Sequence, residues 1–169
     1  MVSWFIISVT NPYPIFYSFC FVDEALIPMN RPVLPIRARG TPKVGEKVAF
    51  RRTLTEADVA LFIGTTWDVN PLHTDEVYCN ATPFKHRIVP GLLTASLLTH
   101  LGGLWAFLAT EMEFHFLAPV YVGDSITAEG EVVEFDDQSG AVLLRCKCTN
   151  QNGKEVLRAD VRGFPGKFE

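Results

Sequence analysis

The sequence predicts an α+β domain in which an antiparallel sheet wraps around one buried central helix. The chain has 169 residues, 48% of them hydrophobic, which is enough apolar material for one core of ordinary domain size. Residues 92–108 are apolar around nearly every face, a pattern typical of a helix inside the protein. After Thr110 apolar and polar residues alternate, which indicates half-buried strands.

The chain divides into three regions of different composition. Residues 1–30 are an apolar N-terminal extension, residues 31–43 are a linker rich in proline and glycine, and residues 44–169 are the domain. Proline and glycine prevent regular structure in the linker, so the regular hydrophobic pattern begins only after it.

The extension is uncharged over residues 1–22, yet it is a poor membrane span. The prolines of Asn11–Pro14 leave apolar runs that are too short to cross a bilayer, and no Lys or Arg precedes them as in a secretory signal. We expect the extension to pack against the domain or a partner subunit, without stable membrane insertion. A start at Met29 and a true membrane anchor are the alternatives.

The net charge argues against nucleic-acid binding, and the cysteine pattern argues against a metal site. The formal net charge is −4 at pH 7, so the protein lacks the excess of bases that nucleic-acid binding requires. The four cysteines form no C-x-x-C pair and have no further ligand pair nearby, so we expect buried, reduced thiols in a cytoplasmic protein, with no metal and no cofactor.

The first elements can be placed from their capping residues. Residues 47–54 form a short strand candidate, and the apolar run that follows begins a helix. Thr55 is its expected N-cap, and Asp58 stands three residues later in the capping-box position. Residues 64–88 are rich in loop formers and contain one short helix candidate at 75–80.

The second half is expected to be one buried helix followed by a meander. Pro90 and Gly91 open the helix, and Gly102–Gly103 end or bend it. Met112, Phe114 and Phe116 then face one side of a strand. Three further strands are expected at residues 125–135, 141–150 and 156–164. With turn-forming residues between these strands, this is the outline of a hot dog fold.

The densest set of reactive side chains lies between Asp68 and His73. On a continuous helix, residues five apart would point about 140° away from each other. Pro71 and the restriction it places on Asn70 break such a helix, so the chain can turn and bring Asp68 and His73 together. A carboxylate beside an imidazole can orient it, fix its tautomer and let it deprotonate water near neutral pH.

A second feature stands where the buried helix begins. A helix N-terminus offers unpaired N–H groups and a positive dipole end, and Gly91 lets a substrate approach the backbone closely. These properties suit an oxyanion hole for a polarised carbonyl. A carboxylate–imidazole pair with such a donor fits addition of water to an activated double bond, or its elimination.

Three sequence blocks resemble the MaoC-like (R)-specific enoyl-CoA hydratases. They are Asp68–His73 (Asp-Val-Asn-Pro-Leu-His), Ile88–Leu93 (Ile-Val-Pro-Gly-Leu-Leu) and Phe116–Asp124, and the similarity runs from about Val44 to Phe164. The resemblance implies a hot dog homodimer that reversibly adds water, with syn geometry, to trans-2-enoyl thioesters and gives (R)-3-hydroxyacyl thioesters. The substrate carrier would be coenzyme A or acyl carrier protein.

The resemblance also implies roles for single residues. Asp68 and His73 would activate the water, and the Gly91 N–H would bind the thioester carbonyl. Thr99 stands where family members have a serine that hydrogen-bonds the catalytic Asp, so we count it with the substrate-binding residues. Asn70 is a substrate-binding candidate that can equally serve the turn, and Arg87 is the base best placed for the phosphates of coenzyme A.

Trp67 and His100 carry two further expectations. Trp67 replaces the small residue that usually precedes the family's Asp, so its indole is expected to narrow the acyl pocket or to reshape the turn. His100, on the buried helix, is expected to be a hydrogen-bonded core residue.

A hot dog thioesterase and a non-catalytic acyl-thioester-binding subunit are the competing functions, and the sequence leaves the acyl chain length open.

Overall fold

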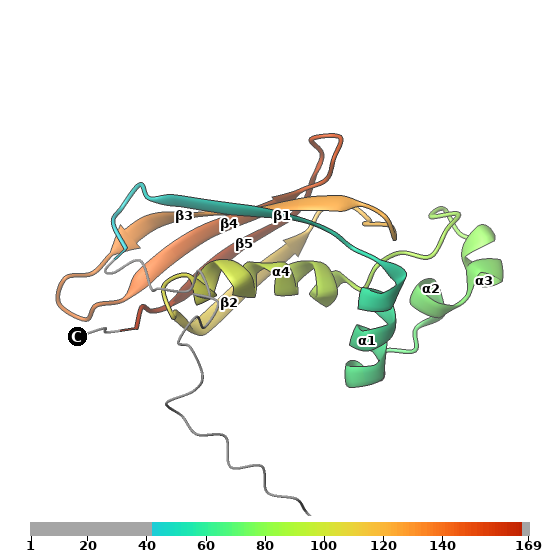
Figure 1. Ribbon diagram of the computed structural model, residues 1–169, viewed down its shortest axis with the longest axis horizontal. Coiled ribbons are helices and arrows are strands. Elements are labelled where there is room, and N and C mark those ends of the chain that lie inside the picture. Colours follow the sequence, from blue (N-terminus) through green and yellow to red (C-terminus); the bar gives the residue numbers. More distant parts are fainter. Residues whose placement is uncertain (1–41, 167–169) are drawn as a thin grey trace, which may run out of the picture. The chain divides into compact units, whose positions relative to one another are not determined.

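The computed structural model describes residues 42–166, so the extension at 1–30 and nearly all of the linker lie outside the described residues. The described part is an antiparallel sheet with helices inserted between its first and second strands (Figure 1). In chain order the elements are β1 (Lys47–Thr53), α1 (Glu56–Thr66), α2 (Pro71–Thr74), α3 (Glu76–Asn80), α4 (Gly91–Gly103), β2 (Leu108–Phe116), β3 (Ser125–Phe135), β4 (Val142–Thr149) and β5 (Glu155–Phe164).

The strands lie in the order β1-β3-β4-β5-β2, and every neighbouring pair is antiparallel. β3, β4 and β5 form a meander because each follows the last through a tight turn. Gly140 and Gly153 adopt left-handed backbone angles in these two turns, with φ of 76° and 75°. β1 and β2 complete the sheet at its opposite edges. The predicted strands are confirmed within one residue at each end, except that β2 begins at Leu108, ahead of the expected start after Thr110.

α1 begins as its capping residues predict. The Thr55 hydroxyl accepts a hydrogen bond from the Asp58 N–H, and the Asp58 carboxylate accepts one from the Thr55 N–H at 2.9 Å. This reciprocal pair satisfies two N–H groups that a helix start otherwise leaves unpaired. Hydrogen bonds from Thr55 also hold the pKa of the Asp58 carboxyl below its ordinary value.

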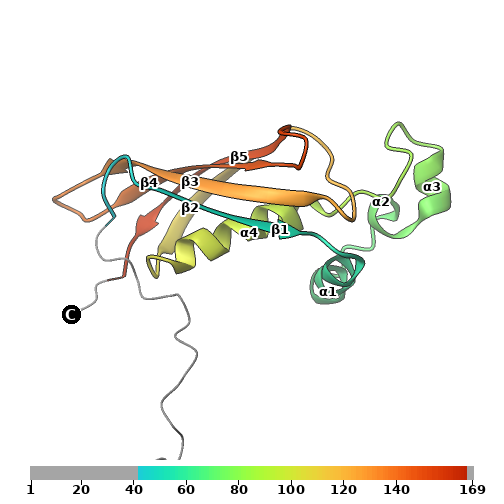
Figure 2. The same cartoon turned by 45° about the horizontal axis from the view of Figure 1, so that its top comes forward.

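α4 lies along one face of the sheet, and the strands curve over it in both views (Figures 1 and 2). Its core-facing leucines pack against β1, β2 and β3, and burial of each such side chain stabilises the fold by about 1.5–3 kcal/mol. They are Leu93, Leu97, Leu98 and Leu101. The predicted α+β arrangement, in which an antiparallel sheet wraps around one helix, is therefore confirmed.

The helix ends at Gly103, as Gly102–Gly103 predicted, and Leu108 is already the first residue of β2. The expectation that the helix is buried on every face is wrong, because its outer side is open and Leu92 is 58% exposed. His100 lies on this open side and is not a core residue; its ring packs against that of Phe50, with the ring centroids 4.3 Å apart and the planes tilted by 46°.

The segment between α1 and α4 contains a helix that the sequence did not predict. Pro71 interrupts the chain after α1, but it is also the first residue of the short helix α2. Proline suits that position because its fixed φ is helical and the N–H it lacks would have no helical partner there. Among residues 42–166, no helix is long and apolar enough to span a membrane.

Candidate active site

Asp68 and His73 come together because the chain reverses direction after α1. Trp67 ends that helix in the left-handed conformation, with φ of 58°, and Asp68 follows it outside the helix. The Asn70 side chain accepts a hydrogen bond from the Leu72 N–H at 3.0 Å and so starts α2, which carries His73. As a result, His73 Nε2 lies 3.6 Å from Asp68 Oδ2.

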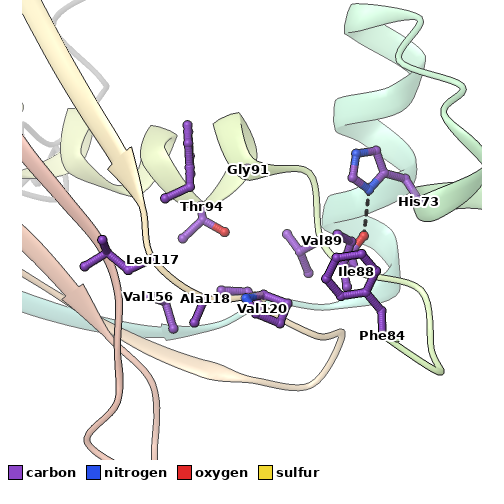
Figure 3. A pocket seen from close by; sticks show the side chains of 12 residues that line it. His73, Phe84, Ile88, Val89, Gly91, Thr94, Leu117, Ala118, Val120 and Val156 are labelled. Carbon is purple, nitrogen blue, oxygen red and sulfur yellow. Dashed lines mark hydrogen bonds between the residues drawn. The ribbon is translucent and has the colours of Figure 1, made fainter. Parts of the chain in front are cut away.

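A backbone carbonyl, and not Asp68, fixes the orientation of the His73 ring. His73 Nδ1 lies 2.8 Å from the carbonyl oxygen of Ile88 (Figure 3, dashed line). Because a carbonyl oxygen can only accept, Nδ1 must be the donor, and in the neutral ring Nε2 keeps its lone pair. The expectation that the carboxylate sets the tautomer is therefore corrected, and Asp68 faces a free acceptor.

This arrangement leaves two acceptors facing each other across a short gap. The Asp68 carboxylate oxygens accept hydrogen bonds, and 3.6 Å is too long for a direct hydrogen bond to His73 Nε2. One water molecule that donates a hydrogen to each group would satisfy both. The imidazole could then take a proton from that water while the carboxylate holds its oxygen in place.

Several backbone contacts hold the His73 turn in position. The Ile88 N–H donates to the Leu72 carbonyl at 3.0 Å, and the Val89 N–H donates to the Val120 carbonyl at 2.7 Å. The Cys79 thiol, which is fully buried, lies 3.4 Å from the same Leu72 carbonyl. The side chain of His73 is thus braced by the segment that leads into α4.

The N-terminus of α4 opens into a cavity of about 310 Å³ that His73 also lines. Most of the lining is apolar, including Phe116, Ala118 and Val120, and the polar exceptions are His73, the backbone at Gly91 and the hydroxyl of Thr94 (Figure 3). The N-cap residue is Pro90, which supplies no side-chain hydrogen bond to the first turn. Side-chain capping therefore does not compete with a ligand for the first N–H groups of α4.

Gly91 stands where no larger residue would fit without a shift. A β carbon at this position would lie 3.0 Å from Cε1 of the Phe116 ring. The absence of a side chain therefore leaves the helix N-terminus open to the cavity, as the sequence predicted for close approach of a ligand.

The substrate-binding candidates outside this cavity have other partners. The Asn70 side chain caps α2. The Arg87 guanidinium makes two hydrogen bonds to Glu56, at 2.9 and 3.0 Å, and these raise the pKa of Arg87. The Thr99 hydroxyl donates to the Ser96 carbonyl at 2.6 Å, and no hydrogen bond between Thr99 and Asp68 is present within residues 42–166.

Trp67 does not narrow the cavity. It is 83% exposed and lies outside the cavity lining, and its effect is on the turn that delivers Asp68. Sequence reasoning missed Thr94, Phe116 and the carbonyl of Ile88. Of these, only Thr94 carries a sequence signal, because it stands one helical turn after Gly91 and thus on the same side of the helix.

Comparisons with known proteins identify the family. The family model described as "MaoC like domain" matches residues 40–150. The (R)-specific enoyl-CoA hydratase of Rhodospirillum rubrum is 34% identical over 123 residues, which are 70% of this chain and 84% of that protein. The (R)-specific enoyl-CoA hydratase of Aeromonas caviae is 33% identical over 117 residues, which are 66% of this chain and 86% of that protein.

The fold is also that of a solved hydratase. The structure of the (R)-hydratase from A. caviae superposes with a TM-score of 0.71 at 29% identity, covering 75% of this chain and 98% of that one. The predicted hot dog fold and the resemblance read from the three sequence blocks are thereby confirmed. The chain belongs to the MaoC-like domain family.

Proposed function

We propose that this protein is an (R)-specific enoyl-CoA hydratase. As a hydro-lyase it adds water reversibly to trans-2-enoyl thioesters and forms (R)-3-hydroxyacyl thioesters. The observation that carries the proposal is the separation of 3.6 Å between His73 Nε2 and Asp68 Oδ2, next to a cavity into which the N-terminus of α4 opens. The named relatives, at about one-third identity, support the same activity.

In the proposed reaction, Asp68 and His73 hold one water molecule through its two hydrogens. His73 Nε2 takes a proton as the water oxygen bonds to the β carbon of the enoyl group. The electron pair of the double bond moves toward the thioester carbonyl, whose oxygen accepts a hydrogen bond from the Gly91 N–H. The proton held by His73 then returns to the α carbon on the same face, so that one water is consumed and the addition is syn.

Asp68→Asn tests this assignment directly. The Asp68 side chain is 43% exposed, so the substitution removes its charge with little effect on folding. We expect hydration of crotonyl-CoA, followed as loss of enoyl absorbance, to fall by about 10²–10⁴-fold, the usual contribution of such a group. Asp137→Asn, a change of the same kind at an exposed turn, should hydrate normally. A folded Asp68→Asn enzyme with undiminished turnover would contradict the proposed role.

The rival functions give different products. A thioesterase would release free coenzyme A from both crotonyl-CoA and butyryl-CoA, whereas a hydratase releases it from neither. A non-catalytic binding subunit would be stabilised by crotonyl-CoA without converting it. Product chirality, and a series of chain lengths on coenzyme A and on acyl carrier protein, would then define the substrate.

A homodimer is part of the same proposal. Three apolar side chains beside the cavity support it, since Leu92, Phe116 and Leu117 are 58%, 53% and 48% exposed in the single chain. Light scattering during size-exclusion chromatography would measure the oligomer.

Location and domain limits are proposed on separate grounds. The free thiols of Cys79, Cys146 and Cys148 support a cytoplasmic location. We also assign the activity to residues 44–169, so deletion of residues 1–28 should leave turnover intact.

A further inference from the structure

Beside the proposed reaction centre, one buried polar group has no partner in the described part of the chain. Thr94 is 3% exposed, and its hydroxyl makes no hydrogen bond within residues 42–166. A helical threonine usually donates its hydroxyl proton to a carbonyl one turn earlier, as Thr65 does to Leu61 at 2.9 Å. An unpaired buried hydroxyl lowers stability, so its presence here calls for an explanation.

The position of Thr94 directs its hydroxyl toward the start of α4. Residues three apart in a helix are neighbours on one face, and side chains tilt toward the helix N-terminus. The Thr94 side chain therefore lies over the first turn, where Gly91 opens into the cavity. Figure 3 shows the Thr94 oxygen turned into the cavity that Gly91 and His73 also line.

The remaining cavity wall gives this hydroxyl nothing to bind. Val89, Ala118, Val120 and Val156 also line the cavity, and their side chains are apolar. The polar groups of the cavity are thus an N–H donor at Gly91, a hydroxyl at Thr94 and the imidazole of His73. Two donors on one helix turn, in apolar surroundings, suit a ligand oxygen that gains negative charge.

We propose that the Thr94 hydroxyl donates a second hydrogen bond to the thioester carbonyl oxygen of the substrate, beside the Gly91 N–H. The inference rests on the proposed function and adds a substrate-contacting residue to it. A hydroxyl proton can rotate about the C–O bond, so the donor follows the carbonyl oxygen as charge accumulates there. Binding of substrate also supplies the partner that the buried hydroxyl lacks.

Thr94→Val tests the proposal because it removes the hydroxyl and keeps the shape. We expect kcat/KM for crotonyl-CoA to fall by about tenfold to a hundredfold, at or below the lower limit of the loss of about 10²–10³-fold seen when one oxyanion donor is removed, because the Gly91 N–H remains. The ligand-free protein should melt about 2–4 °C higher, because an unpaired buried group has gone. Thr94→Ser, which restores the hydroxyl, should recover activity to within about threefold of the original enzyme.

A matched control separates the lost hydroxyl from the valine substitution itself. Thr127 lies on β3, between the core-facing residues Ile126 and Ala128, so its side chain points to the other face of the sheet. Thr127→Val should leave turnover unchanged. A purely structural role for Thr94 would instead lower the melting temperature and the activity of Thr94→Val together.

Butyryl-CoA, which cannot be hydrated, provides a readout that is independent of turnover. With a ¹³C-labelled carbonyl, the infrared stretch of the bound ligand should lie at lower frequency in the original protein than in Thr94→Val, and Thr94→Ser should restore the shift.

Undiminished turnover in Thr94→Val, or an unchanged carbonyl band, overturns the inference and leaves the hydratase proposal standing. Binding of butyryl-CoA that depends on Thr94, without hydration of crotonyl-CoA, overturns the hydratase proposal and supports the inference. A protein that neither binds nor hydrates overturns both.

Discussion

Gly91→Ala should lower the activity of the proposed enzyme without lowering the stability of its fold. The new methyl group would stand at the first residue of α4 and face Phe116, with carbon–carbon distances of 3.0, 3.2 and 3.4 Å to three ring atoms. Favourable carbon contacts begin at about 3.5 Å, so the ring must retreat by about half an ångström. Phe116 is 53% exposed and can make that movement.

The stability of Gly91→Ala should therefore not fall. Gly91 has helical backbone angles that alanine adopts, and alanine loses less chain entropy on folding. Such a change stabilises a protein by about 0.4–1 kcal/mol, which offsets the cost of moving an exposed ring. Urea unfolding should give a free energy of unfolding within about 1 kcal/mol of the original value.

Activity should fall sharply in the same variant. In the proposed reaction the thioester carbonyl approaches the Gly91 N–H, and the new methyl group and the displaced Phe116 ring would crowd that approach. Displacement of a substrate by about 1 Å costs about 10²-fold in rate, or about 2.7 kcal/mol, and we expect that loss in kcat/KM for crotonyl-CoA. Gly103→Ala, near the other end of α4, meets no atom within 4 Å and should keep full activity.

Two results, one for Gly91→Ala and one for Gly103→Ala, would contradict this prediction. Full activity in Gly91→Ala with a normal free energy of unfolding would show that the substrate does not approach the helix at this residue. A loss of activity in Gly103→Ala of similar size would show that alanine in α4 acts through the helix as a whole.

Two further predictions follow from the titrating groups. Because hydrogen bonds from Thr55 hold the folded-state pKa of Asp58 below its ordinary value of 3.8, their stabilisation is present at neutral pH and is lost as the pH falls through the folded-state pKa. Thr55→Ala should cost about 1 kcal/mol at pH 7 and progressively less below pH 3.8, as measured by urea unfolding. Burial raises the pKa of Cys146 and Cys148 to about 12, so iodoacetamide at about pH 8 should modify neither thiol in the folded protein and both after unfolding in urea, as read by peptide mass spectrometry.

Local patterns made most of the fold predictable. β3 shows the clearest alternation, since its residues from Ile126 to Val132 are buried at every second position. The capping box at Thr55 depends only on residues within one helical turn, so its geometry could be foreseen from spacing alone. α2 was missed because Pro71 can signal either a break or a first helical residue, and the sequence pattern does not distinguish them.

Long-range contacts limit how much of the candidate site can be predicted from the sequence. The approach of Asp68 to His73 followed from the turn between them, but the group that orients His73 is the backbone carbonyl of Ile88. A carbonyl has no sequence signature, since every residue carries one. Arg87 likewise looked available for a phosphate until the fold placed Glu56 beside it. Such partners are decided by tertiary packing.

The strand order has a consequence for how the protein folds. β3, β4 and β5 can pair through short turns, whereas β1 and β2 must find partners far along the chain, as in the pairs Lys47–Glu131 and Leu108–Phe164. Closing long loops costs entropy before the new contacts repay it, so the meander should form first. The segment that carries Asp68, His73 and Gly91 connects these two late strands. A refolding chain should therefore regain most of its sheet before it brings the proposed catalytic residues together.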